Sequence, residues 1–350
     1  MSITMGIVFS TPSDQVVRNL GYALKRVETP FFVCKMVSDF CEVSSFSSCD
    51  FCIEAHKDPD DPSRFCAFKF LDLFNVDLKP KDVDSAMKFI NRCKSIYWPC
   101  DHWSPDFVES EKTIMIDVCT TILLPLCNEV ILERRYQDSL ESMHWSSLTC
   151  GAIRLGTPKT WHGTPDGRVR AGGVNLLCSK TDEGDAGSDE ESDGMTTKIK
   201  IKLANLPQLV AMNVVSAFIE HSLHPGLNPM VPSILIGKNR FRVSLYHCEK
   251  DILLLSGEVS LSTGSFLSQS AVVLLWAVLN HRRFLVDTLP SGGNYKVGIK
   301  SRLERGDKLK HFTALSDKTV DWYKARDALT FADGGIHFLP PRKKTKVAAQ

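Results

Sequence analysis

The segment TWHGTPDGRV (residues 160–169) carries one carboxylate, Asp166, at a tight turn that leads directly into a short predicted strand. Pro165 and Gly167 flank this acid, as turn residues do. Two interpretations stay open. Asp166 is either a turn residue before a strand, or a metal ligand projected from the start of that strand, where a carboxylate can hold a divalent cation.

Other side chains with catalytic or metal-binding chemistry are scattered along the chain. Cys49 and Cys52 form a Cys-x₂-Cys pair with His56 nearby, but a structural zinc site usually shows two such pairs. Zinc on Cys49 and Cys52 is therefore not expected, and we interpret these cysteines as ordinary core or loop residues, since cysteine also behaves as a small buried hydrophobic residue. His144 and His162 flank the turn, yet the sequence has no G-x-S-x-G nucleophile motif and no glycine-rich phosphate loop.

The elements that must position these residues follow from hydrophobic periodicity and turn signals. Residues 105–136 predict a long buried helix that Pro125 should kink. Residues 167–170 and 174–180 predict a hairpin, and residues 205–223 predict a helix with Pro207 in its first turn. Further strands are expected at 151–156, 196–203, 233–237, 240–248 and 251–256, and a buried helix at about 266–281.

Composition limits the class of protein. The chain has 350 residues, of which 43% are hydrophobic and 24% charged, so it can bury a sizeable core. Because the formal net charge is +1, a nucleic-acid surface would have to be a local patch. The first residues do not resemble a signal peptide, and the longest apolar run, residues 271–279, is shorter than the ~20 residues that cross a bilayer. We expect an intracellular protein without a membrane partner.

The order of these features resembles the PD-(D/E)xK restriction-endonuclease-like nuclease superfamily, in particular its phage-type exonuclease branch. The shared series is a helix, the Pro-Asp-Gly turn opening a strand, a strand ending in lysine, and a helix opening with Gln208. It covers about residues 105–255. The resemblance implies an α/β fold: a restriction-endonuclease-like core at 105–285, with a mixed sheet flanked by helices. A cysteine-rich, helical N-terminal extension (1–104) and a C-terminal extension (286–350) would surround it.

The resemblance also implies roles for individual residues. Asp166 would be the first acid of a Mg²⁺ site, and Gln208 the supporting glutamine of the following helix. Glu129 or Glu133 would supply an acid from the preceding helix, with Glu133 the first choice as a second metal ligand. In such a site the metal lowers the pKa of a bound water and clamps phosphate oxygens, while a lysine stabilises developing charge.

The second acid of the family motif is missing in both registers that the sequence permits. In one register Lys180 is the lysine, and Cys178 occupies the acid position. In the other Lys200 is the lysine, and Lys198 occupies the acid position; we favour this register because its strand runs directly into the helix of Gln208. With a single carboxylate, Mg²⁺ binding is expected to be weak at best.

Two biased segments complete the sequence. Residues 181–195 include an acidic tract without large apolar residues, which predicts a disordered insertion. The C-terminal tail resembles a nuclear import signal that an import receptor would recognise. The nucleus is therefore the expected compartment, with the cytoplasm as the alternative. The basic cluster consists of Arg342, Lys343, Lys344 and Lys346.

The function expected from these features is a nuclease-fold protein with an eroded metal site, acting as a regulatory module or as one that binds DNA or RNA. One alternative is an active Mg²⁺-dependent nuclease, cleaving DNA or RNA, that uses Asp166 and Lys200. Another is a non-catalytic scaffold whose acidic tract holds a basic partner protein.

Overall fold

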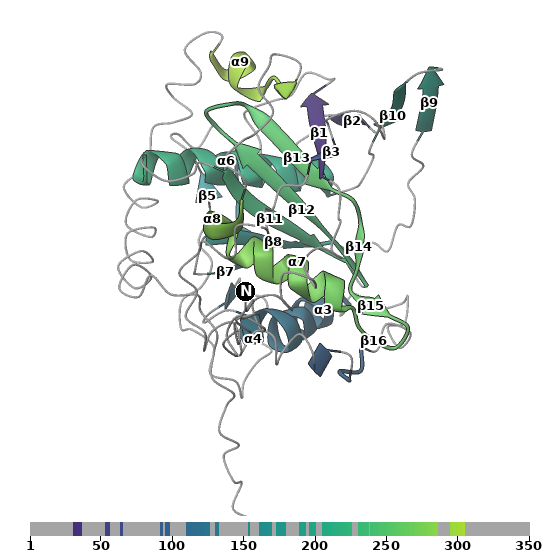
Figure 1. Cartoon of the computed structure of the whole chain (residues 1–350). Helices are drawn as coiled ribbons and strands as arrows, with labels where there is room; N and C mark the ends of the chain where they lie inside the picture. The colour runs from purple at the N-terminus through teal and green to yellow at the C-terminus, as the bar shows by residue number, and fades with distance from the viewer. Residues whose placement is uncertain are drawn as a thin grey trace, which may run out of the picture.

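A computed structural model of the chain shows a mixed α/β fold in which a mostly antiparallel sheet is flanked by helices (Figure 1). The structure describes residues 31–36, 53–56, 64–65, 92–93, 95–98, 110–126, 130–132, 153–154, 161–169, 173–179, 189–193, 196–200, 205–225, 230–237, 239–285 and 295–304.

The described strands form one large sheet with the order β4-β7-β8-β11-β12-β13-β1-β2-β10-β9; β14 pairs with β12, and β3 with β1. All pairs are antiparallel except β8 and β11, which run parallel. The strands are β1 (Phe31–Met36), β2 (Ile53–His56), β3 (Arg64–Phe65), β4 (Val130–Leu132), β7 (Gly167–Val169), β8 (Val174–Cys178), β9 (Asp189–Asp193), β10 (Thr196–Lys200), β11 (Met230–Ile236), β12 (Arg240–His247), β13 (Ile252–Ser256) and β14 (Val259–Ser260).

Helices cover both faces of this sheet. On one face lies α6 (Leu206–Leu223), and on the other lie α3 (Ser110–Val118) and α7 (Gln269–Leu279). Because side chains alternate along a strand, β8 sends Leu176 to the α3–α7 core and Leu177 to the α6 core. A strand that is buried on both faces needs a continuous apolar run, and ILLLS in β13 has that composition.

Short elements complete the described chain. A π-helical turn (Cys119–Leu123) and α4 (Leu124–Leu126) continue α3, while α8 (His281–Phe284) and α9 (Ile299–Glu304) follow α7. β5 (Ile153–Arg154) pairs with β6 (His162–Gly163), and β15 (Ser262–Thr263) pairs with β16 (Phe266–Leu267). No helix within these ranges is long and apolar enough to cross a membrane.

Several predicted elements are confirmed. The hairpin of β7 and β8, the helix α6 with Pro207 at its start, the strands β11 to β13 and the buried helix α7 all lie where periodicity placed them. Each of these segments has an unambiguous repeat of two or 3.6 residues, or a run of apolar residues bounded by turn residues.

Other predictions were wrong. The helix predicted over 105–136 ends at Leu126, beyond the Pro125 position, and the chain continues as the strand β4. Within the predicted helical extension 1–104, β1 lies between β13 and β2 in the main sheet, and β2 and β3 are strands as well. Part of the acidic tract is also a strand, because β9 pairs with β10; residues 181–188 lie outside the described residues.

Candidate functional site

Asp166 is held at the start of β7 by a contact with the end of β8. The backbone N–H of Cys178 donates a hydrogen bond to Asp166 Oδ2 at 2.6 Å, and the Asp166 side chain is almost completely buried. In the register of this hairpin Gly167 lies opposite Leu176, so Asp166 and Cys178 lie at the same end of the paired strands. The carboxylate thus caps the last backbone group of the neighbouring strand.

The sheet order decides between the two possible lysine strands. β8, which ends at Cys178 two residues before Lys180, pairs directly with β7. β10, which contains Lys198 and Lys200, pairs with β2 and β9, and six strands separate it from β7. At about 4.8 Å per strand spacing, Lys200 lies on the order of 30 Å from the Asp166 strand. The preference for the Lys200 register was therefore wrong.

The helix that follows is placed as the sequence predicted. Gln208 lies in the first turn of α6, and its side chain is partly exposed. Just before this turn, Asn205 Nδ2 donates to Ser179 Oγ at 3.2 Å, which fixes the start of α6 beside the end of β8. Gln208 thus begins the helix that starts next to the Asp166–Cys178 corner.

The structure does not test the remaining candidates of the metal site. Glu133 was expected on a helix, but the residues directly before it form β4; Glu129, Glu133 and Lys180 themselves lie outside the described residues. Groups of three or more metal-ligating side chains are absent from the part of the chain that the structure describes.

Among the residues that the structure describes at this corner, the donors do not form a set that suits Mg²⁺. The ion prefers several hard oxygen ligands and usually takes one or two carboxylates together with water and phosphate oxygens. Asp166 offers one buried carboxylate whose Oδ2 already accepts the Cys178 N–H, and Cys178 offers a thiol, a soft donor. We therefore derive no metal-dependent step from this site.

A second group of polar residues, which sequence reasoning missed, crosses the sheet beneath α6. These residues lie side by side on four neighbouring strands, as the pairing registers show, and all are buried. Burying so many polar groups is costly unless they form hydrogen bonds. We call the row and its partners on α6 the polar seam; its sheet members are Arg168 on β7, Asn175 on β8, Ser233 on β11 and Ser244 on β12.

The helix side of the polar seam consists of Asn213, Ser216 and Glu220, which share one face of α6. Asn175 Nδ2 donates to Ser216 Oγ at 2.7 Å, and Asn213 Nδ2 donates to Ser244 Oγ at 2.8 Å. The spacing of three and four residues among polar side chains in an otherwise apolar helix was the signal that could have revealed this face.

The polar seam ends in a charged cluster around Glu220. Its Oε1 accepts a hydrogen bond from Arg168 Nη2 at 3.1 Å, and its Oε2 accepts one from Arg282 Nη2 at 3.0 Å. The Arg168 side chain is fully buried, while that of Arg282 is 28% exposed. Nearby His281 donates from Nδ1 to the Val278 carbonyl, and burial, together with the charge of Arg282, lowers the pKa of His281 to about 3.

The cysteines within the described ranges are core residues. All five (Cys34, Cys93, Cys119, Cys178 and Cys248) are buried, and burial is the main cause that raises the pKa of Cys34, Cys93 and Cys248 to about 12. Cys49 and Cys52 lie outside the described residues, as do His144 and the whole basic tail 342–346.

Searches of protein-family models, curated proteins and solved structures find no match to this chain. The described residues define the class of fold, a mixed α/β protein whose sheet is covered by helices. Any conclusion about function depends on the residues around Asp166 and on the polar seam.

Proposed function

We propose that this chain is a nucleic-acid-binding module with a restriction-endonuclease-like core whose metal site lacks its second acid. The observation that carries the proposal is the hydrogen bond from the Cys178 backbone to Asp166. It places the acid of the Pro-Asp-Gly turn against the residue two positions before Lys180. In a PD-(D/E)xK site that residue would be the second acid, and here it is a cysteine.

The order of the surrounding elements supports the same reading. After α3 the neighbouring strands β4, β7 and β8 follow, with β5 and β6 between β4 and β7; β9 and β10 then precede α6, and β11 after α6 runs parallel to β8. The resemblance implies a core with a helix, three antiparallel strands, a crossover helix and a parallel strand, and this series of elements is compatible with it. A parallel neighbour requires a crossover connection, and α6 supplies it.

The missing carboxylate argues for binding without cleavage. One buried carboxylate and a thiol cannot assemble the hard oxygen shell that Mg²⁺ requires, so the retained property of such a core would be contact with the nucleic-acid backbone. Backbone binding depends on counterion release, so affinity should fall linearly with salt on logarithmic axes.

The first experiment measures duplex DNA binding by fluorescence anisotropy across a series of salt concentrations, without added metal. We expect salt-dependent binding by the wild type, because contacts with phosphates release counterions. Binding that does not change with salt, or no binding at low salt, would contradict the proposal.

The second experiment rebuilds the acid. Cys178→Asp should increase the Mn²⁺ or Mg²⁺ affinity measured by calorimetry, whereas Cys178→Ser, which has no carboxylate, should not. The gain should disappear in Asp166→Asn combined with Cys178→Asp. Lys198→Glu should leave the metal affinity unchanged, because six strands of the sheet separate β10 from the Asp166 strand β7. Metal-dependent cleavage by the wild type would refute the eroded-site proposal.

A further inference from the structure

Two aromatic residues from distant parts of the sequence face each other across a short ladder. Tyr97 pairs with Phe266 as an antiparallel bridge. Backbone hydrogen bonds flank the bridge: Trp98 N–H donates to the Ser265 carbonyl at 2.9 Å, and Leu267 N–H donates to the Ile96 carbonyl at 3.1 Å. Residues directly opposite in such a pair have Cβ atoms about 5 Å apart on the same face. We call Tyr97 and Phe266 the aromatic pair.

The aromatic pair is exposed although its supports are buried. Tyr97 is 55% exposed and Phe266 46%, and they are the large hydrophobic side chains left exposed among the residues that the structure describes. Their chain neighbours Trp98 and Leu267 are each only 2% exposed and anchor the two segments in the core. The hairpin of β15 and β16, which carries Phe266, lies at the start of α7 (Figure 1). The rings are therefore presented from ordered backbone.

The size of the aromatic pair indicates a small planar ligand. Aromatic side chains bury about 150–250 Å² each, so two half-exposed rings offer about 200 Å². A stable protein interface needs about 800 Å² on each partner. The surrounding described residues are polar and exposed, among them Arg92, Ser95 and Ser265. The apolar area thus suits one or two nucleobases better than a protein surface.

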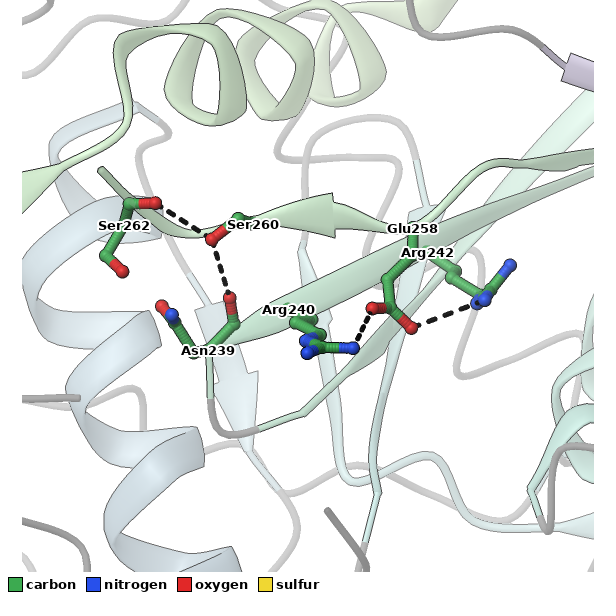
Figure 2. Close-up of polar contacts among 6 residues, drawn as sticks. All are labelled: Asn239, Arg240, Arg242, Glu258, Ser260 and Ser262. Carbon is green, nitrogen blue, oxygen red and sulfur yellow. Dashed lines mark hydrogen bonds and ion pairs between the residues drawn. The ribbon is translucent and has the colours of Figure 1, made fainter. Parts of the chain in front are cut away.

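Positive charge lies on β12, which pairs with β14, the strand that leads into this hairpin. Arg240 and Arg242 both contact the carboxylate of Glu258 (Figure 2). The Arg240 side chain is 60% exposed, so its guanidinium group is accessible beside that contact. Arg240 pairs with Ser260 of β14, and the Ser260 hydroxyl donates to the Ser262 carbonyl at 2.8 Å where β15 begins. Thr263 of β15 pairs with Phe266 of β16. From Ser260 to Thr263 the chain advances by at most about 10 Å, so Arg240 is close to the aromatic pair along this strand.

From this juxtaposition we propose that the aromatic pair is a stacking platform for the bases of single-stranded nucleic acid, with Arg240 contacting the phosphates. The inference rests on the proposed function, since it assumes that the chain binds nucleic acid. It places single-stranded nucleic acid on the aromatic pair, a different surface from the Asp166 corner. Every base has a π-face, so the platform would tolerate any sequence.

The test uses the full chain and a fluorescent oligothymidylate of about 12 nucleotides, a length within the usual site size of single-strand-binding surfaces. Tyr97→Ala and Phe266→Ala should each weaken binding by about 10-fold, the usual scale for loss of one stacked base. Phe266→Trp should keep the affinity because it keeps a ring, and Ser265→Ala, a change in the same hairpin, serves as the matched control. Circular dichroism confirms that each variant is folded.

An abasic oligonucleotide of the same length separates stacking from phosphate binding. The wild type should bind it about as weakly as a variant with both Tyr97→Ala and Phe266→Ala binds the normal strand, and Phe266→Ala should not weaken binding to it further. Arg240→Gln should weaken binding to both oligonucleotides and reduce the salt dependence by about one phosphate contact.

Three outcomes would overturn the inference. If the ring variants bind single strands as the wild type does, the platform is wrong, and duplex binding at the Asp166 core is unaffected. If the wild type binds neither single strands nor duplex at low salt, the proposed function fails as well. If sedimentation shows self-association that Tyr97→Ala abolishes, and no oligonucleotide binds, the aromatic pair is a protein contact.

Discussion

Replacing Glu220 by Gln would leave two guanidinium groups without their shared carboxylate. Arg168 is the critical one, because its side chain is fully buried and pairs with Glu220 Oε1 at 3.1 Å. Arg282 is 28% exposed and can be solvated by water instead. Breaking a buried ion pair by removing one partner typically costs about 3–5 kcal/mol, because the remaining charge is uncompensated. Gln keeps one acceptor oxygen, so we expect a loss of about 3 kcal/mol.

The assay is urea unfolding at neutral pH, followed by circular dichroism. Glu249→Gln is the matched control: Glu249 lies 3.5 Å from His221 Nε2 in a pair that is mostly exposed, and such pairs contribute about 0–1 kcal/mol. Replacing both Arg168 and Glu220 by Met should recover most of the lost stability, because the buried charge is then absent. A loss below about 1 kcal/mol for Glu220→Gln, or one equal to that of the control, would refute this account of the charged cluster.

Three further perturbations test other described contacts. The pKa of His281 is lowered to about 3 in the folded protein, so as the pH falls below 6.5 the unfolded state binds a proton that the folded state does not. The free energy of unfolding should therefore fall by up to about 1.4 kcal/mol per pH unit below pH 6.5. In thermal melts over a pH series, His281→Phe should reduce this pH dependence. Asp251, whose carboxylate accepts the backbone N–H of Gly298 at 3.1 Å, should release the segment before α9 when changed to Ala, measured as faster hydrogen exchange at Gly298 without global unfolding. Asn213→Ala should cost about 1–3 kcal/mol by leaving the buried Ser244 hydroxyl without its donor, whereas Asn213→Leu with Ser244→Ala should be much less costly in the same urea assay.

The sequence predicted the elements whose pattern is local. The turn at Asp166, the hairpin of β7 and β8, and the first turn of α6 with Gln208 needed only turn residues, alternation and helix periodicity. Both candidate lysine strands were also identified as strands. The choice between them was wrong because it relied on proximity along the chain, as Lys200 is close to α6 in sequence but lies far across the sheet.

The polar seam was missed for a different reason. Asn213, Ser216 and Glu220 are individually ordinary helix residues, and only the register of four strands shows that each has a buried polar partner. Arg168, two residues after Asp166, was not singled out in the sequence, and only the structure shows that its side chain is fully buried.

By itself, the sequence determined the local conformations, the composition of a large apolar core and the lack of a carboxylate two residues before either lysine, because these depend on residue type and short spacing. The tertiary structure alone decided which strands are neighbours. It placed β1 from the N-terminal region inside the sheet, separated Lys200 from Asp166 and brought Tyr97 beside Phe266. Strand pairing between distant segments is selected by the burial of both faces of the whole sheet, and no local pattern encodes that choice.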